Sequence, residues 1–392
     1  MSLSRRRFVQ TAAGAAITSA FVSARGREAL AGLWARGIEE PLYAADPAML
    51  IISSNENPVG PGKTVMDAVK KSLGATGTPA GRYPFSNEND LIDAIAAKWK
   101  VKRENVLIGC GSTQILRTAT QVFTSKDRAL VGSIPTYEEC AGYAELMGSP
   151  VKGTKLNSAL AMDLDATADA AKGSGLIFYC NPNNPTATVH TPSDTDAFIR
   201  KVRQSSPETT FLIDEAYIDY VASPSHKSEI ERAINDPRIV VARTFSKAYG
   251  MAGLRVGYAI GHVDTIKKMS NWESGGSLNT IGIAAAIAAI NQDPTFIENE
   301  RARNKEARDF TRNFFHKAGY KDSESNTNFL FVDVKTPIQE FQKACREQFI
   351  QVGRPFPPLT TYARISIGTL DEMKKATQVF AKVLNVSAKA AA

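Results

Sequence analysis

The feature that most restricts the fold of this chain is an alternation of short apolar runs with segments of helical periodicity. Six apolar runs have the length of buried strands, at residues 105–109, 128–133, 175–180, 209–214, 238–242 and 256–261. Amphipathic stretches such as 89–99 and 195–203 separate them. Because strands that alternate with helices form βαβ units, we predict a mostly parallel sheet with helices on both faces. Ligands of such sheets bind at the carboxyl ends of the strands.

The chain is long enough for two domains. Its 392 residues are 43% hydrophobic and 22% charged, which is ordinary for a protein with a large core. A charged helix at about residues 294–318 is expected to lead out of the large domain, and strands of a smaller domain are expected at 328–334 and 363–367. We therefore expect a leader at 1–45, an N-terminal part of the small domain at 46–80, the large domain at 81–295 and the rest of the small domain at 296–392.

The N-terminal segment has the pattern of an export signal. Three adjacent arginines at positions 5–7 stand between Ser4 and Phe8, and a run of small and apolar residues follows at 11–24. That run is too short for a helix that spans a bilayer, which needs ~20 apolar residues. The segment resembles a twin-arginine signal, which implies export of the folded protein and no stable membrane insertion after the signal is removed. The cleavage site, after Ala24 or near Ala45, stays open, and so does a cytoplasmic location.

The net charge of +7 does not indicate nucleic-acid binding. Several of the positive charges fall in the N-terminal segment, and no basic run elsewhere is interleaved with aromatic residues. The four histidines and four cysteines show no CxxC pair and no metal-ligand spacing, so we expect no metal site. A disulfide in an oxidising compartment stays open, whereas Cys110 and Cys180, near the ends of predicted strands, are expected to be free thiols.

A candidate catalytic lysine follows the fifth apolar run. Lys247 stands beside the hydroxyl residues Thr244 and Ser246, and Arg255 comes after a turn that contains glycine. An amine held beside hydroxyls and a guanidinium suits a cofactor that carries both a carbonyl group and a phosphate. Taken alone, the pattern is also consistent with one more solvent-exposed lysine.

Eight motifs in order give the chain a resemblance to a known family. They are SSNENPVGP (53–61), RYP (82–84), GCGST (109–113), PTY (135–137), NPNNPT (181–186), DEAY (214–217), SKAYGMAGLRVGY (246–258) and RISIGT (364–369). From about residue 51 to near the C-terminus, the chain resembles the fold-type I aminotransferases that use pyridoxal phosphate, and most closely the histidinol-phosphate aminotransferase group. The resemblance implies an α/β fold, with a mostly parallel seven-stranded sheet in the large domain and a smaller α/β domain. It also implies that an amino group moves from an L-amino acid to a 2-oxo acid by a ping-pong mechanism through Lys247.

The resemblance assigns most motif residues to the cofactor. Lys247 would bind pyridoxal phosphate covalently and shuttle the substrate proton, with Asp214 and Tyr217 as the other catalytic residues. Asp214 would keep the pyridine nitrogen protonated. The remaining contacts would come from Gly111, Ser112, Thr113, Thr244, Ser246 and Arg255 to the phosphate, from Tyr137 to the ring face, and from Asn184 and Tyr217 to the phenolic oxygen. We expect the positive charges of Arg255 and of the cofactor to lower the pKa of Lys247.

The resemblance also implies substrate contacts and a homodimer. Arg364 would bind the substrate α-carboxylate by a bidentate fork, and Arg354 would take a distal acidic group. Asn57 lies in the segment that closes over the substrate, and Tyr83 would reach the cofactor phosphate of the neighbouring subunit. The loop between the two arginines is shorter than expected for histidinol-phosphate enzymes, so the side chain of the substrate stays open.

Two departures from the family pattern accompany other functions that stay open. Gln114 stands where many relatives have an acid, and Ala187 stands where they usually have glycine. A decarboxylase or lyase of the same fold would also keep Arg364. A regulator that binds the cofactor would need a DNA-binding domain in place of the export signal, which disfavours it. A binding protein that holds the cofactor without turnover is a further alternative, and the donor and acceptor are not identified.

Overall fold

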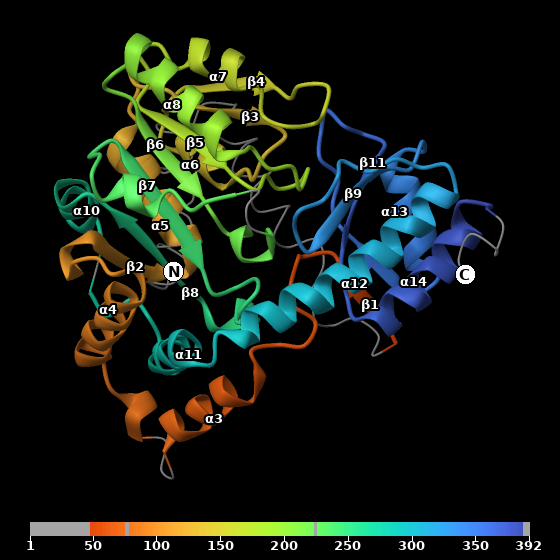
Figure 1. Ribbon diagram of the computed structural model, residues 1–392, viewed down its shortest axis with the longest axis horizontal. Helices are drawn as coiled ribbons and strands as arrows, with labels where there is room; N and C mark the ends of the chain where they lie inside the picture. The colour runs from red at the N-terminus through yellow and green to blue at the C-terminus, as the bar shows by residue number, and fades with distance from the viewer. Residues whose placement is uncertain (1–47, 75–77, 223–225, 274, 387–392) are drawn as a thin grey trace, which may run out of the picture.

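The computed structural model describes residues 48–74, 78–222, 226–273 and 275–386. The export signal predicted within residues 1–45 lies outside these ranges. The described chain forms a larger part around a seven-stranded sheet and a smaller part beside it (Figure 1). The boundaries proposed above at residues 80 and 295 stay predictions.

The central sheet has the strand order β2-β8-β7-β6-β5-β3-β4. Its strands are β2 (Val106–Cys110), β3 (Leu130–Ile134), β4 (Val151–Lys155), β5 (Leu176–Cys180), β6 (Thr210–Asp214), β7 (Ile239–Thr244) and β8 (Val256–Gly261). Strand β8 runs antiparallel to both of its neighbours, and the other paired strands are parallel. The predicted mostly parallel sheet is therefore confirmed, and six of its strands fall on the predicted apolar runs.

Strand β4 has no counterpart among those runs. Its sequence, VKGTK, contains two lysines, and all five of its residues are at least partly exposed. It lies at the edge of the sheet, next to β3. An edge strand of this kind presents little apolar surface, and its lysines oppose pairing with another chain. The polar edge explains why no apolar run marks this strand in the sequence.

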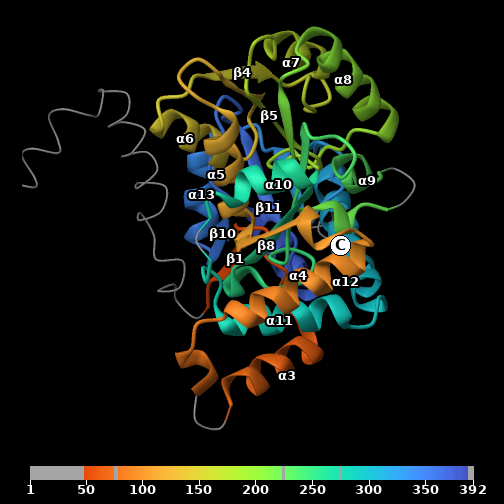
Figure 2. The ribbon, with the colours of Figure 1, turned by 90° about the vertical axis from the view of Figure 1, so that its left-hand side faces the viewer.

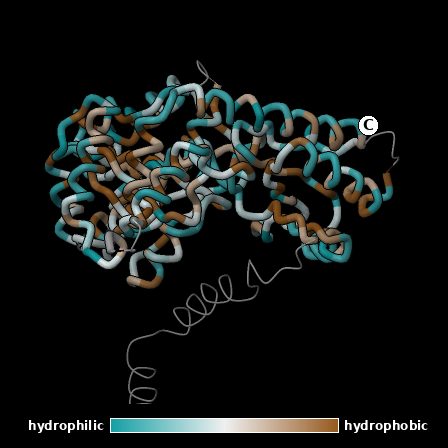
Figure 3. Tube along the Cα trace, turned by 90° about the horizontal axis from the view of Figure 1, so that it is seen from below, coloured by the Kyte–Doolittle hydropathy of each residue, from teal (hydrophilic) through white to brown (hydrophobic). Residues whose placement is uncertain are grey.

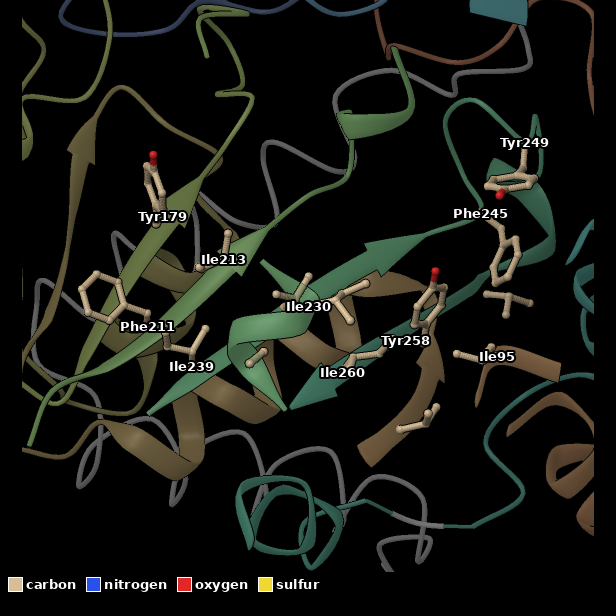
Figure 4. Close-up of a cluster of buried hydrophobic side chains, with 14 of the residues drawn as sticks. Ile95, Tyr179, Phe211, Ile213, Ile230, Ile239, Phe245, Tyr249, Tyr258 and Ile260 are labelled. Carbon is tan, nitrogen blue, oxygen red and sulfur yellow. The ribbon is translucent and has the colours of Figure 1, made fainter. Parts of the chain in front are cut away.

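Helices cover both faces of the sheet. One core includes side chains of α4 (Phe85–Trp99), α7 (Leu164–Ala170), α8 (Pro192–Ser205), α9 (Ile230–Ala233) and α11 (Thr280–Asn291), and the other includes side chains of α5 (Gly111–Phe123), α6 (Glu139–Leu146) and α10 (Val263–Ser270). Successive residues of a strand point to opposite faces. Ile177 and Tyr179 accordingly join the first core, whereas Leu176 and Phe178 join the second. Figure 4 shows the first core, with Tyr179 and Phe211 on neighbouring strands. Two covered faces account for the continuous apolar runs.

Helix α12 (Thr295–Lys317) leads from the larger part into the smaller one (Figure 1). The smaller part contains β1 (Leu50–Ile52), β9 (Phe329–Asp333), α13 (Ile338–Arg346), β10 (Ile350–Val352), β11 (Tyr362–Ser366) and α14 (Leu370–Val383). Strand β1 pairs in parallel with β10, and β11 pairs antiparallel with β9. A separate apolar core joins these elements, and Figure 3 shows apolar stretches inside each part. This pairing brings the segment after β1 to the boundary between the two parts.

Helix α3 (Gly62–Leu73) continues that segment and packs on α11, as Figure 2 shows. Short 3₁₀ turns occur at Thr78–Gly81, Arg103–Asn105, Ile218–Tyr220 and Ala252–Leu254. Among the residues described, no helix combines the length and apolar character that crossing a membrane requires. All four cysteines are free, and three of them are buried.

Candidate active site

The carboxyl ends of neighbouring strands meet where the large sheet faces the smaller part of the molecule. The register places Cys180 of β5 beside Asp214 of β6, and Asp214 beside Ala242 of β7. A pocket of about 1340 Å³ opens at this edge. Twelve of the predicted site residues line it, namely Ser112, Thr113, Tyr137, Asn184, Asp214, Tyr217, Thr244, Ser246, Lys247, Arg255, Arg354 and Arg364. Residues more than 250 positions apart are thus gathered around one pocket.

Lys247 lies in the turn after β7, with its amine in the pocket. The Nζ atom donates to the carbonyl oxygen of Ser54 at 3.1 Å and lies 5.6 Å from the ring centroid of Tyr217. Burial lowers the pKa of Lys247 to about 8, and the positive charge of Arg364 adds to this effect. The expected lowering of the pKa is present, and the predicted effect of Arg255 is one of its causes. Burial and Arg364 contribute more than Arg255 does.

Asp214 is the last residue of β6 and is 2% exposed. Its Oδ1 atom accepts a hydrogen bond from the backbone N–H of Ala216 at 3.2 Å. Burial raises the pKa of this carboxyl to about 7, although the Ala216 N–H and the charge of Lys247 both favour the ionised form. A cationic nitrogen placed against Asp214 would therefore stabilise its ionised state.

A corner lined by hydrogen-bond donors forms where β8 passes the first turn of α5. Gly111 has φ +70°, and a Cβ atom there would lie 2.3 Å from Nη2 of Arg255. At Gly257 a Cβ atom would lie 2.3 Å from the backbone nitrogen of Ser112. The two glycines therefore let a guanidinium and a helix N-terminus approach each other closely. Together with nearby hydroxyl groups, these donors suit a phosphate.

The two departures from the family pattern have structural roles here. Gln114 accepts a hydrogen bond from the backbone N–H of Cys110 at 2.6 Å and donates to Glu273, so it fixes the turn into α5. Ala187 has φ +61° and is fully buried. A left-handed backbone favours glycine, so the substitution keeps a backbone conformation that alanine adopts at a cost.

The aromatic and amide residues of the pocket are held by hydrogen bonds. Thr113 hydrogen-bonds the side chain of Tyr137, whose pKa burial raises to about 12. Tyr217 accepts from Nδ2 of Asn55 at 3.0 Å, and burial raises its pKa well above the usual range. Asn55 also accepts from Ser366 at 2.9 Å, which joins the segment after β1 to β11. Sequence reasoning missed Asn55, although it lies within the SSNENPVGP motif and has φ +57°.

Arg364 of β11 crosses from the smaller part into the pocket. Its Nη1 atom donates to Oδ1 of Asn184 at 2.8 Å, and Nη2 donates to the carbonyl oxygen of Ser53 at 2.6 Å. Its buried Nε atom has no hydrogen-bond partner within the described part of the chain. Burial lowers the pKa of Arg364 to about 10. A buried guanidinium with an unused N–H group is suited to a carboxylate ligand.

Three predicted residues do not line this pocket. Gly111 instead contacts Arg255, to whose carbonyl oxygen its N–H donates at 3.1 Å. Asn57 donates to the carbonyl oxygen of Ala248 at 3.0 Å and so braces the backbone next to Lys247. Tyr83 is 81% exposed on the surface. Residues that line the pocket without having been predicted include Asn55, Glu56, Glu138, Gln342, Lys343, Arg346 and Gln351.

No group of three or more His, Cys, Asp or Glu side chains in the described ranges is arranged to hold a metal ion. The polar groups of the pocket instead suit an organic ligand with a phosphate. Comparison with known sequences identifies the family. The profile of aminotransferase class I and II matches residues 47–380. The chain belongs to the class I and II aminotransferases.

This aminotransferase is 31% identical to the histidinol-phosphate aminotransferase of Moorella thermoacetica over 323 residues, which cover 81% of each protein. It is 32% identical to the aromatic amino acid aminotransferase of Nocardia farcinica, over 83% of this chain and 88% of that protein. The structure of the histidinol-phosphate aminotransferase of Sinorhizobium meliloti in complex with pyridoxal-5'-phosphate shares the fold. The TM-score is 0.79 at 24% identity, with 86% of this chain and 91% of that chain covered.

The cofactor of this aminotransferase is pyridoxal phosphate, and three features of the pocket fit it. Lys247 offers an amine with a lowered pKa to its carbonyl group. The corner at Gly111 and Arg255 offers donors to its phosphate. Asp214, buried with a raised pKa, offers a carboxylate to its ring nitrogen.

Proposed function

We propose that this aminotransferase moves the amino group of an L-amino acid to a 2-oxo acid by a ping-pong mechanism through Lys247. One observation carries the proposal. A lysine with a lowered pKa, a buried carboxyl with a raised pKa and the guanidinium of Arg364 line the same pocket. These are the base, the partner of the ring nitrogen and the carboxylate receptor that the reaction requires.

We assign each group of the cofactor to a different set of residues around the pocket. When bound, pyridoxal phosphate supplies a ring that accepts the electron pair released at the substrate Cα atom. Asp214 would keep the ring nitrogen protonated, and Tyr137 would pack on the ring. Asn184 and Tyr217 would hydrogen-bond the phenolic oxygen. The phosphate would be held by the backbone of Gly111, which lies against Arg255, and by the pocket residues Ser112, Thr113, Thr244, Ser246 and Arg255.

Lys247 has two tasks. It would hold the cofactor covalently, and its free amine would move a proton at the substrate Cα atom. The second task needs a neutral amine, and a pKa of about 8 makes such an amine accessible near neutral pH. Arg364 contributes to both binding and proton transfer, because it holds the substrate carboxylate and also lowers the pKa of Lys247.

The relatives indicate which donors to test first. By name they act on histidinol phosphate and on aromatic amino acids. Both of these substrates contain a planar ring, so we propose a donor with a planar ring in its side chain as the first candidate.

The test follows the absorbance of the cofactor on the purified protein when single amino acids are added without an oxo acid. A true donor should convert the cofactor to its amino form, and a 2-oxo acid should restore the original spectrum. Lys247→Ala should show no such exchange. A spectrum that no donor changes would overturn the proposal, and release of CO₂ without recovery by an oxo acid would favour a decarboxylase of the same fold.

We also propose that two copies form the active enzyme, with Tyr83 reaching the neighbouring site. Tyr83 and Phe85 stack with ring centroids 5.5 Å apart, although they are 81% and 56% exposed. An exposed aromatic pair of this kind suits an interface. Tyr83→Ala and Lys247→Ala should each reduce activity, and mixed dimers should regain part of it, because one site then has both residues intact. A monomer by sedimentation would contradict this proposal.

Export through the twin-arginine pathway is a further proposal, supported by the arginines at positions 5–7 and the apolar run that follows. Residues 1–45 fused to a folded reporter should carry it out of the cytoplasm. Replacing Arg5 and Arg6 by lysine should keep the reporter inside. A reporter that stays in the cytoplasm with the natural arginines would contradict export.

A further inference from the structure

The substrate side of the pocket contains an ion pair that the sequence motifs do not indicate. Nη1 of Arg354 lies 3.1 Å from Oε1 of Glu138, and Nη2 contacts Oε2 more closely. Both side chains are about one-third exposed, at 35% and 34%. Arg354 follows β10 in the smaller part of the molecule, and Glu138 follows Tyr137 just before α6. Both Nη atoms of Arg354 thus contact the carboxylate of Glu138, and this ion pair lines the pocket.

The pair lies next to the proposed carboxylate receptor. The guanidinium carbons of Arg354 and Arg364 lie 4.1 and 4.9 Å from the centroid of the same ring, that of Phe356. The charge of Arg354 lowers the pKa of Arg364, and the charge of Glu138 raises it. Arg364, Arg354 and Glu138 therefore line the same pocket, with the ion pair close to the proposed carboxylate receptor.

We infer that Glu138 is a specificity-determining residue that excludes donors and acceptors with a distal acidic group. The inference rests on the proposed function. Arg354 is the residue predicted to bind such a group, but both of its Nη atoms already contact Glu138, and Nη1 also donates to the carbonyl oxygen of Pro355 at 2.9 Å. An incoming carboxylate or phosphate must displace Glu138 and then lies beside a second negative charge, which opposes binding.

A donor with a neutral side chain does not have to displace Glu138 from Arg354. It can pack against the paired arginine and the neighbouring pocket residues Pro355 and Pro357 without breaking the ion pair. The net charge of the whole pocket does not by itself discriminate between neutral and acidic side chains. Its lining has six cationic residues and three carboxylates among the described residues, an excess that attracts acids of every kind. Discrimination against a distal acid therefore depends on the carboxylate that faces Arg354.

The test compares single-turnover kcat/KM for glutamate and aspartate with that for phenylalanine and tyrosine, each followed through the cofactor absorbance of the holoenzyme. Glu138→Gln keeps the size of the side chain and removes its charge. We expect it to raise the ratio of acidic to neutral donors by at least tenfold. In an Arg354→Gln background, the same substitution should leave that ratio unchanged, because no arginine remains to be released.

The neighbouring Glu139 provides a matched control. It pairs with Arg117 at 2.5 Å and does not line the pocket. Glu139→Gln should leave the ratio within twofold of the wild type. The inference is wrong if Glu138→Gln changes acidic and neutral donors by the same factor, or if the gain for acids persists without Arg354. Failure of every donor in the wild-type enzyme would instead count against the proposed function.

Discussion

Arg364 donates a hydrogen bond to Oδ1 of Asn184 at 2.8 Å, although the two residues belong to different parts of the molecule. Arg364 lies on β11 of the smaller part, and Asn184 lies in the turn after β5 of the large sheet. Arg364, the proposed receptor for the substrate carboxylate, is thus hydrogen-bonded to Asn184, the proposed contact for the phenolic oxygen of the cofactor. A ligand that binds one of them is expected to affect the position of the other.

The first prediction concerns this guanidinium. Arg364→Lys keeps the charge but loses the planar fork and the hydrogen bond to Asn184. We expect kcat/KM for the amino-acid half-reaction to fall about 100-fold, which corresponds to about 3 kcal/mol and is within the usual cost of truncating a buried charge pair. Stopped-flow absorbance of the cofactor measures this. Arg117→Lys, on the surface beside Glu139, is the control. A loss of less than threefold at Arg364 would contradict its role.

The second prediction concerns the pH dependence of stability in the cofactor-free protein. The pKa of Asp214 is about 7 in the folded state, whereas the ordinary value for an exposed aspartate is 3.8. Between these values the folded state holds a proton that the unfolded state has lost, so stability should fall as the pH rises through this window. Asp214→Asn removes this loss, and we expect it to stabilise the cofactor-free protein at pH 8 by roughly 1–3 kcal/mol.

Urea unfolding at pH 5 and pH 8 checks this prediction. Asp169→Asn serves as the control, because Asp169 is 66% exposed and lies 3.8 Å from a lysine amine. The Asp214 variant should at the same time bind pyridoxal phosphate more weakly. Equal stability of the wild type and Asp214→Asn at pH 8 would show that burial of the carboxyl carries no cost.

Strands that coincide with continuous apolar runs could be predicted from the sequence. Strands β5, β6 and β7 are buried on both faces, so their runs are apolar throughout. The edge strand β4 has two lysines and no such run. Residues at the carboxyl ends of these strands, such as Asp214, were predicted to lie near the cofactor because parallel strands end at one edge of a sheet.

Contacts between distant segments could not be predicted in this way. Glu138 follows a motif residue, but its partner Arg354 is 216 positions away. Asn55 meets Tyr217 across 162 positions. A single sequence contains no local pattern that indicates a contact between residues so far apart. Arg255 was correctly predicted to lower the pKa of Lys247, but the largest cause was missed, because burial depends on the assembled pocket rather than on neighbouring residues.

The third prediction separates backbone strain from steric contact at the phosphate corner. Gly111 and Gly148 both have positive φ angles, +70° and +76°, so alanine is strained at either position. Only at Gly111 would the added Cβ atom meet Arg255, at 2.3 Å, whereas nothing lies within 4 Å at Gly148. Gly111→Ala should weaken pyridoxal phosphate binding at least tenfold, and Gly148→Ala should leave it unchanged. Absorbance titration of the cofactor-free protein measures both. Equal losses in the two variants would contradict a phosphate site at this corner.

The last prediction concerns the electrostatic link between Arg364 and Lys247. The charge of Arg364 is the strongest charge effect that lowers the pKa of Lys247. In the cofactor-free protein, the rate at which acetic anhydride modifies Lys247 should rise with pH and reach half its maximum near pH 8, because only the neutral amine reacts. Arg364→Gln removes a positive neighbour, so the midpoint should move to higher pH. Peptide mass spectrometry measures the rate, with Nα-acetyl-lysine amide in the same solution as a reference. A midpoint that stays in place, or moves to lower pH, would mean that Arg364 does not act on this amine.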